Sequence, residues 1–429
     1  MQRIRKILLI TEDPVPKPGK GGPGAVIDRI SKELKSKLNE YKWFPVVISL
    51  SSSTKKRRTL VNIIQSILLN VLKNLRERSL VLIIQYKVSH NRILKNLISY
   101  IVTIRLLMCL SRYIKLLKKY NKEIRYADII HCHDIFAMIT LINFLKINPL
   151  TKPTPILLSI HSPGSTTKEI LNRYPMLNNT RYEEILRSLE LYAIRSATAL
   201  IMPSYGTYQL LLNDLPELRF MRKKIFILYN GIKPIVCSKS KVELKNKFGV
   251  KAENIVIVSI GRLIHEKGFD ILIKAIKCVT DNGVSNFHTL IIGEGPERRN
   301  IEKLIQALGL ESKVRLLGRI KDISEAYSIA DIFVSPSRRS AFDLVLLEAL
   351  SASLPIVATD VGGSREAIGD AGILVRPGNP KVLCKALLKL IKDKRLRHEL
   401  SFKAYKRFKE RFHIETVAKS YVELLNSLV

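Results

Sequence analysis

The sequence predicts an α/β protein made of two Rossmann-like domains, each a doubly wound parallel sheet. Short apolar, β-branched runs alternate with helix-length segments, which is the pattern of parallel strands joined by helical crossovers. After residues 230–240 the alternation starts again. The length of 429 residues gives each half enough chain to bury a core of its own.

Six strand candidates lie in each half of the chain. Those of the first half are residues 6–11, 44–50, 127–133, 155–161, 199–204 and 224–230. Those of the second half are residues 254–262, 288–295, 313–319, 331–337, 355–360 and 372–377. Ligands of doubly wound sheets bind beyond the carboxyl ends of the strands, so the residues that follow these runs are the candidates for a site.

We place the hinge between the domains near residues 231–240. The predicted N-terminal domain is 1–233 and the second domain is 234–414. One stretch of the first domain, about 55–126, departs from the pattern and is predicted to be an insertion of basic amphipathic helices.

The charge of the chain is unusual. It has 72 Lys and Arg against 37 Asp and Glu, a formal net charge of +35, which implies an anionic partner. Residues 55–126 hold 17 basic residues and only two acidic ones, Glu77 and Glu123, interleaved with Ile and Leu. This segment is either a solvated basic face over ordinary core packing or a surface that lies on an anionic membrane. Nucleic acid is disfavoured, because aromatic residues do not interleave the basic ones and no nucleic-acid motif is present.

The cysteines and the N-terminus bear on the compartment. Five cysteines are scattered without CxxC spacing, so we expect reduced core residues in a cytosolic protein, with neither disulfides nor a zinc site: Cys109, Cys132, Cys237, Cys278 and Cys384. MQRIRK leads directly into ILLI and TEDPVP, which indicates a first strand and not a signal peptide. The apolar stretch 96–104 is too short to span a bilayer. We therefore expect a cytoplasmic protein, peripheral on the inner face of the cell membrane.

Two segments of the second half carry features of a phosphate site. In SIGRLIHEKGFDILIKAI, 259–276, Gly261 allows a tight turn, and Arg262 and Lys267 flank the entry to a helix. Two cations beside a helix N-terminus are suited to a diphosphate, although either cation alone could simply be solvated. In HTLIIGEG, Gly293 and Gly295 follow a strand directly, where they permit either a plain turn or the close approach of a ligand.

The run PSRRSAFDLVLLEAL, 336–350, places a carboxylate, Glu348, in an otherwise apolar helix. A buried carboxylate costs several kcal/mol unless donors satisfy it. Ribose hydroxyls or nearby backbone amides would serve, so we expect Glu348 to have such partners.

These pieces, in this order, resemble the retaining glycosyltransferases of the GT-B fold, glycosyltransferase family 4, also called glycosyl transferases group 1. The matching pieces cover 254–380 almost without a gap: GRLIHEKG, LIIGEGPERRNIEKLIQALGL, VRLLGRIKDISEAYSIADIFVSPS, FDLVLLEALSASLPIVATDVGGSREAI and GILVRPGNP. The first domain is similar to the family more loosely, through GKGGPGAVIDRISKEL, ADIIHCHD and ILYNGI. The resemblance implies two domains that face each other across a cleft, with the C-terminal helix, 415–429, packing back on the first.

The resemblance also implies a donor site in the second domain. Arg262 and Lys267 would neutralise the diphosphate of a nucleotide sugar, and the helix that starts at Asp343, Leu344 and Val345 would offer its amides to the same phosphates. Glu348 would hold the ribose. The base would rest largely on backbone groups around Gly318 and Arg319. Further donor contacts are expected at Gly21, Gly22, Gly261, Gly293, Gly295 and Ser340.

The first domain is implied to bind a glycan or lipid-linked acceptor. His133 would lie near the donor sugar and the reacting centre, and His161 near the acceptor, although a single histidine is often only structural. No DxD-like pair is placed where a metal would be needed, and cations with a helix dipole can stabilise a leaving diphosphate. We therefore predict transfer without a metal or cofactor. Retention in this family is ascribed to attack on the face from which the phosphate departs.

The chain departs from the family at one point. Members typically carry a Glu eight residues before the position of Glu348, followed by a small residue, an aromatic and a glycine. Here these positions are Ser340, Ala341, Phe342 and Asp343. Asp343 is either a helix N-cap or a replacement for the missing sugar-binding carboxylate. If it is neither, the donor site is degenerate and the protein is a non-catalytic subunit that binds sugar nucleotides or glycans.

Overall fold

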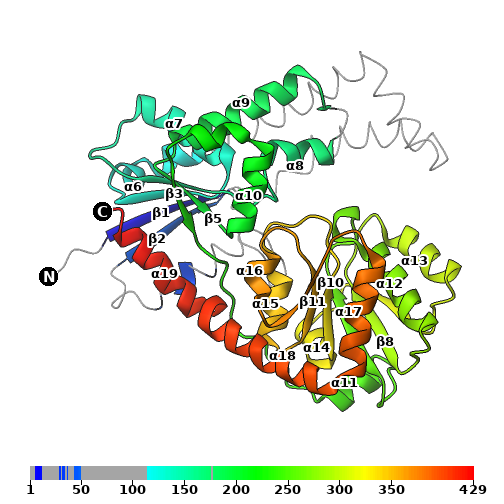
Figure 1. The fold of residues 1–429 in the computed structure, drawn as a ribbon. Helices are drawn as coiled ribbons and strands as arrows, with labels where there is room; N and C mark the ends of the chain where they lie inside the picture. Colours follow the sequence, from blue (N-terminus) through cyan, green and yellow to red (C-terminus); the bar gives the residue numbers. More distant parts are fainter. Residues whose placement is uncertain are drawn as a thin grey trace.

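The computed structural model describes residues 5–11, 29, 31–33, 36, 43–49, 114–174 and 177–429. Gly21, Gly22, Cys109 and residues 55–113 of the basic segment lie outside this part, so the predictions about them stay predictions. Within it, the chain forms two parallel sheets, each flanked by helices (Figure 1), which confirms the predicted fold class.

The first sheet has six parallel strands in the order β2-β1-β3-β4-β5-β6. Their bounds are β1 Arg5–Thr11, β2 Trp43–Ser49, β3 Ile129–Cys132, β4 Ile156–Ser159, β5 Ala199–Met202 and β6 Lys224–Ile227. The sheet order reverses between β1 and β3, and His133 follows β3 at this point. A ligand of a doubly wound sheet binds at such a reversal.

The second sheet has the order β12-β11-β10-β7-β8-β9, again all parallel. Its strands are β7 Ile255–Ile260, β8 Phe287–Ile292, β9 Val314–Gly318, β10 Ile332–Ser335, β11 Ile356–Thr359 and β12 Gly372–Val375. The order reverses between β7 and β10. The segments that follow these two strands, 261–268 and 336–343, are those in which the sequence predicts the diphosphate site.

Each of the twelve predicted strand segments overlaps an observed strand. Most observed strands end before the predicted run does. The run 254–262, for example, gives a strand that ends at Ile260, so Gly261 and Arg262 belong to the loop beyond it. The residues past the strand ends are mostly glycine, proline or polar residues, such as His133, Gly293 and Pro336, and they begin the loops beyond the sheet.

Helices cover both faces of the first sheet. One face packs on α6 Asn121–Arg125, α7 Ile135–Ile147, α9 Arg181–Ser196, α10 Tyr205–Asp214 and a 3-10 turn, Pro216–Phe220. The other face packs on the last helix, α19 Ile414–Asn426. Ile414, Ala418, Tyr421 and Leu425 recur at helical spacing and form the stripe that contacts the sheet. A shorter helix, α8 Thr166–Arg173, follows β4.

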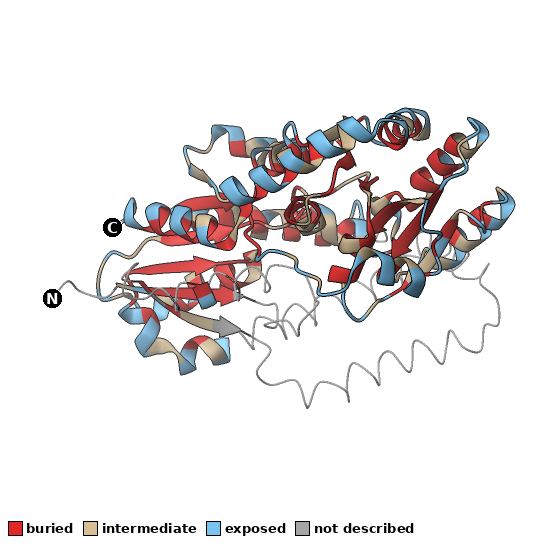
Figure 2. Ribbon diagram, turned by 90° about the horizontal axis from the view of Figure 1, so that it is seen from below, coloured by how far each residue is buried: buried red, intermediate tan, exposed pale blue. Residues whose placement is uncertain are grey.

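The second sheet is likewise covered on both faces, with the buried residues between the layers (Figure 2). Its helices are α11 Lys241–Lys247, α12 Phe269–Asp281, α13 Arg298–Ala307, α14 Ser324–Ile329, α15 Leu344–Ser351, α16 Ser364–Ile368, α17 Pro380–Lys392 and α18 Lys394–Arg407. A π-helical turn, Phe408–Phe412, joins α18 to α19 and returns the chain to the first domain.

The chain passes between the domains twice, and the two passages lie side by side. The amide of Ile232 donates to the carbonyl of Phe412 at 3.0 Å, and the amide of Ile414 donates to the carbonyl of Ile232 at 3.0 Å. Tyr229 packs edge to face on Phe412 with ring centroids 5.5 Å apart. The two passages therefore form one joint between the domains.

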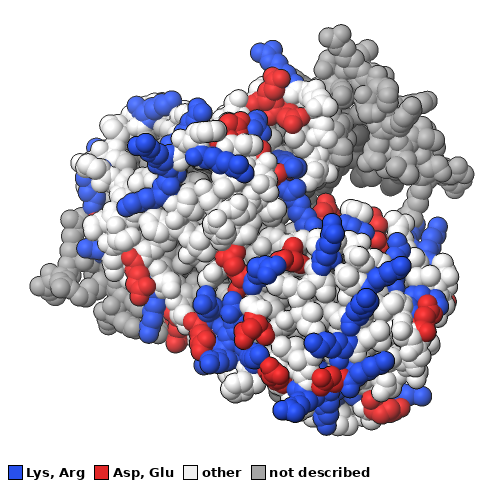
Figure 3. All heavy atoms as spheres, viewed as in Figure 1, with Lys and Arg blue, Asp and Glu red and all other residues white. Residues whose placement is uncertain are grey.

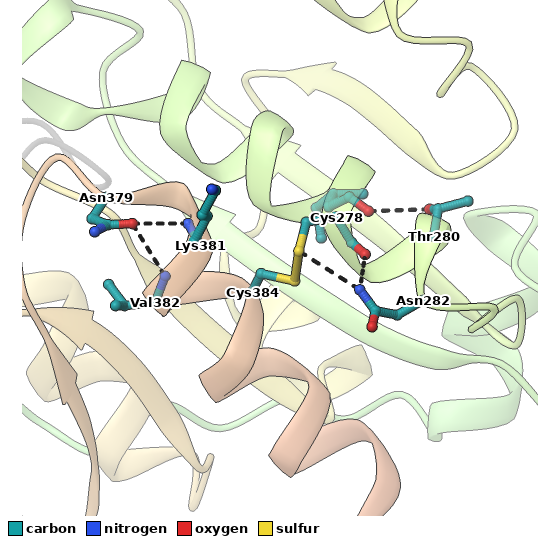
Figure 4. Close-up of a disulfide and its surroundings, with 8 residues drawn as sticks. Cys278, Thr280, Asn282, Asn379, Lys381, Val382 and Cys384 are labelled. Carbon is teal, nitrogen blue, oxygen red and sulfur yellow. Dashed lines mark hydrogen bonds between the residues drawn. A yellow bond between two sulfur atoms is a disulfide. The ribbon is translucent and has the colours of Figure 1, made fainter.

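The prediction that all the cysteines are reduced is wrong. Cys278 on α12 and Cys384 on α17 form a disulfide (Figure 4), while Cys132 and Cys237 are free. The two partners are 106 residues apart in sequence, so no local spacing reveals the pair. They meet because α12 and α17 cover the same face of the second sheet. The cysteines therefore no longer support a reducing compartment.

No helix in the described ranges combines the length and the apolar character that crossing a membrane requires.

Candidate functional site

Glycines bring the loops after β7 and β8 into direct contact. A Cβ at Gly293 would lie 1.8 Å from the carbonyl oxygen of Gly261, and one at Gly295 would lie 2.2 Å from that of Leu263. At Gly318 the φ angle is +67°, a left-handed conformation that favours glycine. The packing of these loops on each other accounts for the glycines without a ligand, while the loops still border the switch point of the sheet.

The predicted diphosphate cations differ in their surroundings. Arg262 is exposed and, among the residues described, forms no ion pair. Lys267 ends the short turn His265–Lys267, and its Nζ lies 2.7 Å from Oδ1 of Asp343. Both side chains of this pair are largely buried, with 24% and 15% of their surface exposed. One of the two expected phosphate ligands is therefore already paired with a carboxylate.

Asp343 occupies the N-cap position of α15, as one of the two hypotheses expected, but its side chain makes no capping hydrogen bond. It points instead to Lys267, with Ser337 and Ser340 as weaker hydrogen-bond partners. These contacts outweigh its burial and hold the pKa of the carboxyl below its usual value. The amides of Leu344 and Val345 begin α15, where a helix leaves its N–H groups without intrahelical partners.

Glu348 has the partner that its apolar helix requires, but that partner is one the sequence did not indicate. The hydroxyl of Tyr327 on α14 donates to Oε2 of Glu348 at 2.7 Å. Burial raises the pKa of this carboxyl, while Tyr327 and the charge of Arg29 oppose the shift. Arg29 belongs to the first domain, so the charge of that domain reaches the ribose end of the predicted donor site.

Ser340 and Arg319 complete the predicted donor residues. Ser340 is buried, with 5% of its surface exposed, and its carbonyl oxygen lies where a Cβ on Gly362 would be only 2.0 Å away. Arg319 is exposed directly after β9. The structure therefore brings the segments after β7, β8 and β10 together, with Gly318 and Arg319 at the end of β9.

A pocket of three histidines lies at the carboxyl ends of β3 and β4. His131 contacts the hydroxyl of Tyr421 at 2.6 Å through Nδ1 and that of Ser159 at 2.8 Å through Nε2. Nδ1 of His133 lies 3.2 Å from Nε2 of His161, with the two rings stacked. The other ring nitrogen of His133, Nε2, is buried and has no hydrogen-bond partner in the described structure.

All three imidazoles are neutral at physiological pH. Burial lowers the pKa of His131 to about 3 and that of His161 to about 4, and it lowers the pKa of His133 well below 6.5. The His133 pair then has two tautomers. If His133 donates to His161 through Nδ1, its Nε2 is an acceptor; if it accepts, Nε2 is a donor. Either way one neutral ring nitrogen is available to a hydroxyl or another uncharged polar group.

The histidine pocket and the donor segment meet at Tyr229. This residue lines the pocket, and its ring stacks on Phe342 of the donor segment with centroids 5.6 Å apart. The predicted roles of His133, near the reacting centre, and of His161, near the acceptor, stay predictions, and the structure brings the two rings into contact. The sequence analysis missed Ser159, Tyr421 and Tyr229. A polar residue at the end of a buried strand marks Ser159, but only the return of α19 brings Tyr421 to the pocket.

In the part of the chain that the structure describes, no three His, Cys, Asp or Glu side chains are grouped in a way that could hold a metal ion.

Comparisons with known proteins agree with this arrangement. The family described as Glycosyl transferases group 1 matches residues 240–407, and that described as Glycosyltransferase Family 4 matches residues 71–234. An uncharacterised glycosyltransferase of Methanocaldococcus jannaschii is 28% identical over 316 residues, which is 69% of this chain and 74% of that protein.

Several solved structures share the fold over 99% of this chain, and two serve as examples. Sucrose-phosphate synthase from Thermosynechococcus elongatus superposes with a TM-score of 0.71 at 18% identity, over 99% of its own length. The Anabaena protein HepE, solved in complex with UDP, superposes with a TM-score of 0.66 at 19% identity, over its full length. With one family match in each domain and this two-sheet architecture, the chain belongs to the GT-B glycosyltransferases of the family 4 type.

Proposed function

We propose that this glycosyltransferase moves a sugar from a nucleoside-diphosphate donor to a hydroxyl of a membrane-associated, lipid-linked or glycolipid acceptor, with retention and without a metal ion. The observation that carries the proposal is the meeting at Tyr229 of two unlike groups of residues. One is the cationic, amide-rich segment after β7 and β10. The other is a pocket of neutral histidines.

The donor side is suited to a diphosphate. Arg262, Lys267 and the first amides of α15 would surround the phosphates and stabilise the charge that develops as the nucleoside diphosphate leaves. The UDP in the HepE structure supports a donor of this class. Because Asp343 already holds Lys267, the diphosphate has to share this cation or displace the carboxylate.

The histidine side is suited to a neutral hydroxyl. With its lowered pKa, His133 is a weak base, so the departing phosphate, whose ordinary pKa is near 6, is the better acceptor for the proton of the attacking hydroxyl. This favours attack on the face from which the phosphate leaves. His133 would then orient a donor or acceptor hydroxyl through Nε2, and His161 would fix its tautomer.

A turnover assay tests the proposal. The protein is incubated with UDP-, GDP-, ADP- and dTDP-sugars, with and without lipid extract, and released nucleoside diphosphate and sugar-labelled product are measured. We expect product only with extract, an anomeric configuration matching that of the donor by NMR, and no loss with EDTA. An inverted product or EDTA-sensitive transfer would reject those parts of the proposal separately.

A second candidate is a subunit that binds sugar nucleotides without turnover. The observation that favours it is the Lys267–Asp343 ion pair, which competes with the phosphates. Calorimetry separates the two candidates. Donor binding without turnover in the presence of every extract fraction supports the second.

The membrane part of the proposal is supported by one end of the first domain. Within residues 114–126 the single acidic residue is Glu123. Five basic side chains of the same segment are exposed: Lys115, Lys118, Lys119, Lys122 and Arg125. In Figure 3, Lys and Arg likewise gather over the upper left, where α6 and α7 lie. Ile147 and Phe220, at the same amino-terminal end of the strands, are 83% and 89% exposed. Cations around protruding apolar side chains suit an anionic bilayer.

Vesicle sedimentation tests this surface. We expect binding to anionic but not to neutral vesicles, weakened by salt and by Phe220→Ser or by Lys122→Glu with Arg125→Glu. Phe402→Ser is the control, because Phe402 is 73% exposed but belongs to α18 of the second domain. Equal binding to both vesicle types, or equal loss with the control, contradicts the membrane proposal.

A further inference from the structure

Two adjacent arginines of the donor segment bind in different domains. Arg338 donates to both carboxylate oxygens of Asp270 at 2.7 Å and to the carbonyl of His265, all within the second domain. Arg339 reaches the first domain. Its Nη2 lies 2.7 Å from Oδ2 of Asp214, and its Nε donates to the carbonyl of Pro163 at 2.9 Å.

Asp214 connects Arg339 to the loop that follows His161. This carboxylate, with 5% of its side chain exposed, also accepts from the amide of Ser165 at 3.0 Å and from Nζ of Lys168 at 2.7 Å. These contacts outweigh burial and hold its pKa below the usual value, so it stays charged. Arg339 thus binds a carboxylate that is already fixed to the loop.

The loop permits this approach through a glycine. Gly164 has a φ of +97°, and a Cβ there would lie 2.2 Å from Oδ2 of Asp214 and 2.7 Å from Nη2 of Arg339. Beyond it, the fully buried Glu190 accepts from the amides of Thr166 and Thr167 at 2.7 and 3.0 Å. The loop is therefore fixed by two carboxylates, that of Glu190 on α9 and that of Asp214 at the end of α10.

A second contact joins the domains at the opposite end of α10. Glu366 on α16 accepts from the amides of Tyr205 and Gly206, at 2.9 and 2.7 Å, at the start of that helix. The backbones pack closely here too, since a Cβ on Gly206 would lie 2.0 Å from the carbonyl oxygen of Gly362. A single contact allows the domains to swivel about it, whereas contacts at both ends of one helix fix their relative orientation.

We propose that Arg339 is a positioning residue that couples the donor segment 336–343 to the acceptor loop 161–168 and so sets the relative orientation of the domains for transfer. It does so through Asp214, without touching either substrate. The roles of the two segments rest on the proposed function. The coupling itself is a property of the apoprotein.

Small-angle X-ray scattering of the full chain tests the coupling without any turnover. Arg339→Gln removes the Arg339–Asp214 contact and leaves the Glu366 contact in place. Arg338→Gln is the matched control, because this neighbouring arginine binds within its own domain. We expect a larger radius of gyration for Arg339→Gln and for Asp214→Asn, no further increase in the double variant, and no change for Arg338→Gln. Thermal melts show whether each variant is folded. If Arg339→Gln does not fold, Arg339→Lys takes its place, because lysine keeps the charge and one of the contacts.

Kinetics then test the positioning role. Misplaced reacting groups lower kcat, so we expect Arg339→Gln to reduce kcat by roughly 10- to 100-fold, with donor affinity within about twofold of the wild type and partial recovery in Arg339→Lys. A radius of gyration unchanged by Arg339→Gln, or a kcat loss no greater than that of Arg338→Gln, overturns the inference. If the wild type shows no turnover with any donor, the proposed function fails, while the scattering result still decides whether the two loops are coupled.

Discussion

The two sides of the candidate site hold their polar groups in different ways. On the first-domain side, buried histidines stay neutral and bond to one another, to Ser159 and to Tyr421. On the second-domain side, Lys267 and Asp343 form an ion pair. Burial dominates the first group and ion pairing the second, although both lie at the carboxyl ends of parallel strands. A sheet thus fixes where a site lies but not its state of charge.

This difference has a functional consequence. A pocket of neutral imidazoles can receive a hydroxyl without losing any ionic interaction, whereas a diphosphate that enters the other side must compete with a carboxylate for Lys267. We therefore expect the stability of the acceptor side to depend on pH. We expect nucleoside-diphosphate binding on the donor side to depend on the charge at position 343.

The largest expected effect is acid destabilisation of the first domain. The folded-state pKa values of His131, His133 and His161 lie below that of an unfolded histidine, so nothing is lost above pH 6.5. As pH falls below 6.5 the unfolded state binds protons first, and stability declines until the folded pKa values, about 3 and 4 for His131 and His161, are reached. At pH 5 the loss is about 2 kcal/mol for each of His131 and His161, and His133, whose pKa burial also lowers, adds to it.

Tryptophan fluorescence measures this loss in one domain. The only tryptophan, Trp43, is fully buried in β2 of the first sheet. We expect its urea midpoint to fall from pH 7 to pH 5, and to fall less in His161→Asn. The exposed His398→Gln should not alter this dependence. Coincident midpoints at the two pH values would mean that these histidines do not govern the stability of the domain.

The second largest effect concerns the disulfide, which lies only in the second domain. The Cys278–Cys384 disulfide joins residues that are 106 positions apart in sequence. In the chain-entropy model, a disulfide that closes a loop of this length stabilises the folded state by roughly 4 to 5 kcal/mol. We expect Cys278→Ser to lower hydrogen-exchange protection of α12 and α17 while the Trp43 transition stays in place. Cys237→Ser, at a free and half-buried cysteine, is the control. An equal shift of the Trp43 transition would show that the domains unfold as one unit.

The sequence predicted local features well and long-range pairs poorly. All twelve strands were found, because a strand buried on both faces is a continuous apolar run. Three pairs of residues that are distant in sequence were not predicted. Lys267 and Asp343 are 76 positions apart, Cys278 and Cys384 are 106 apart, and His131 meets Tyr421 across 290. Pairs of this kind depend on which helices and loops become neighbours, and the pattern along the chain does not contain that information.

The third effect tests the charged side directly. Lys267→Ala removes a cation from the proposed diphosphate site and leaves Asp343 unpaired beside it. We expect kcat to fall by about 10²- to 10³-fold, because the leaving phosphates lose a preorganised positive charge and gain an opposing negative one. Lys274→Ala is a suitable control, since Lys274 is exposed on α12. A loss of activity confined to KM would mean that Lys267 binds the donor without stabilising its departure.

The smallest effect tests the competition between carboxylate and phosphate. Lys267 is freed from its partly exposed ion pair by either of two substitutions, Asp343→Gly or Asp343→Asn. Asparagine keeps the shape of the aspartate. Such a pair is worth about 1 kcal/mol, so we expect calorimetry to show the binding of a free nucleoside diphosphate strengthened about fivefold. Weaker binding would contradict the competition.

Turnover of the same variants distinguishes the two roles left open for Asp343. If the carboxylate only competes, both variants keep or raise kcat. If it replaces the missing sugar-binding Glu, both bind the nucleoside diphosphate more tightly and yet lose transfer. Ser340→Glu alone sets a second carboxylate beside Asp343 at a position with 5% exposure, so like-charge repulsion should weaken donor binding. Only Ser340→Glu with Asp343→Gly restores the family pattern without that repulsion, so recovery of transfer in this double variant would assign the sugar contact to the carboxylate.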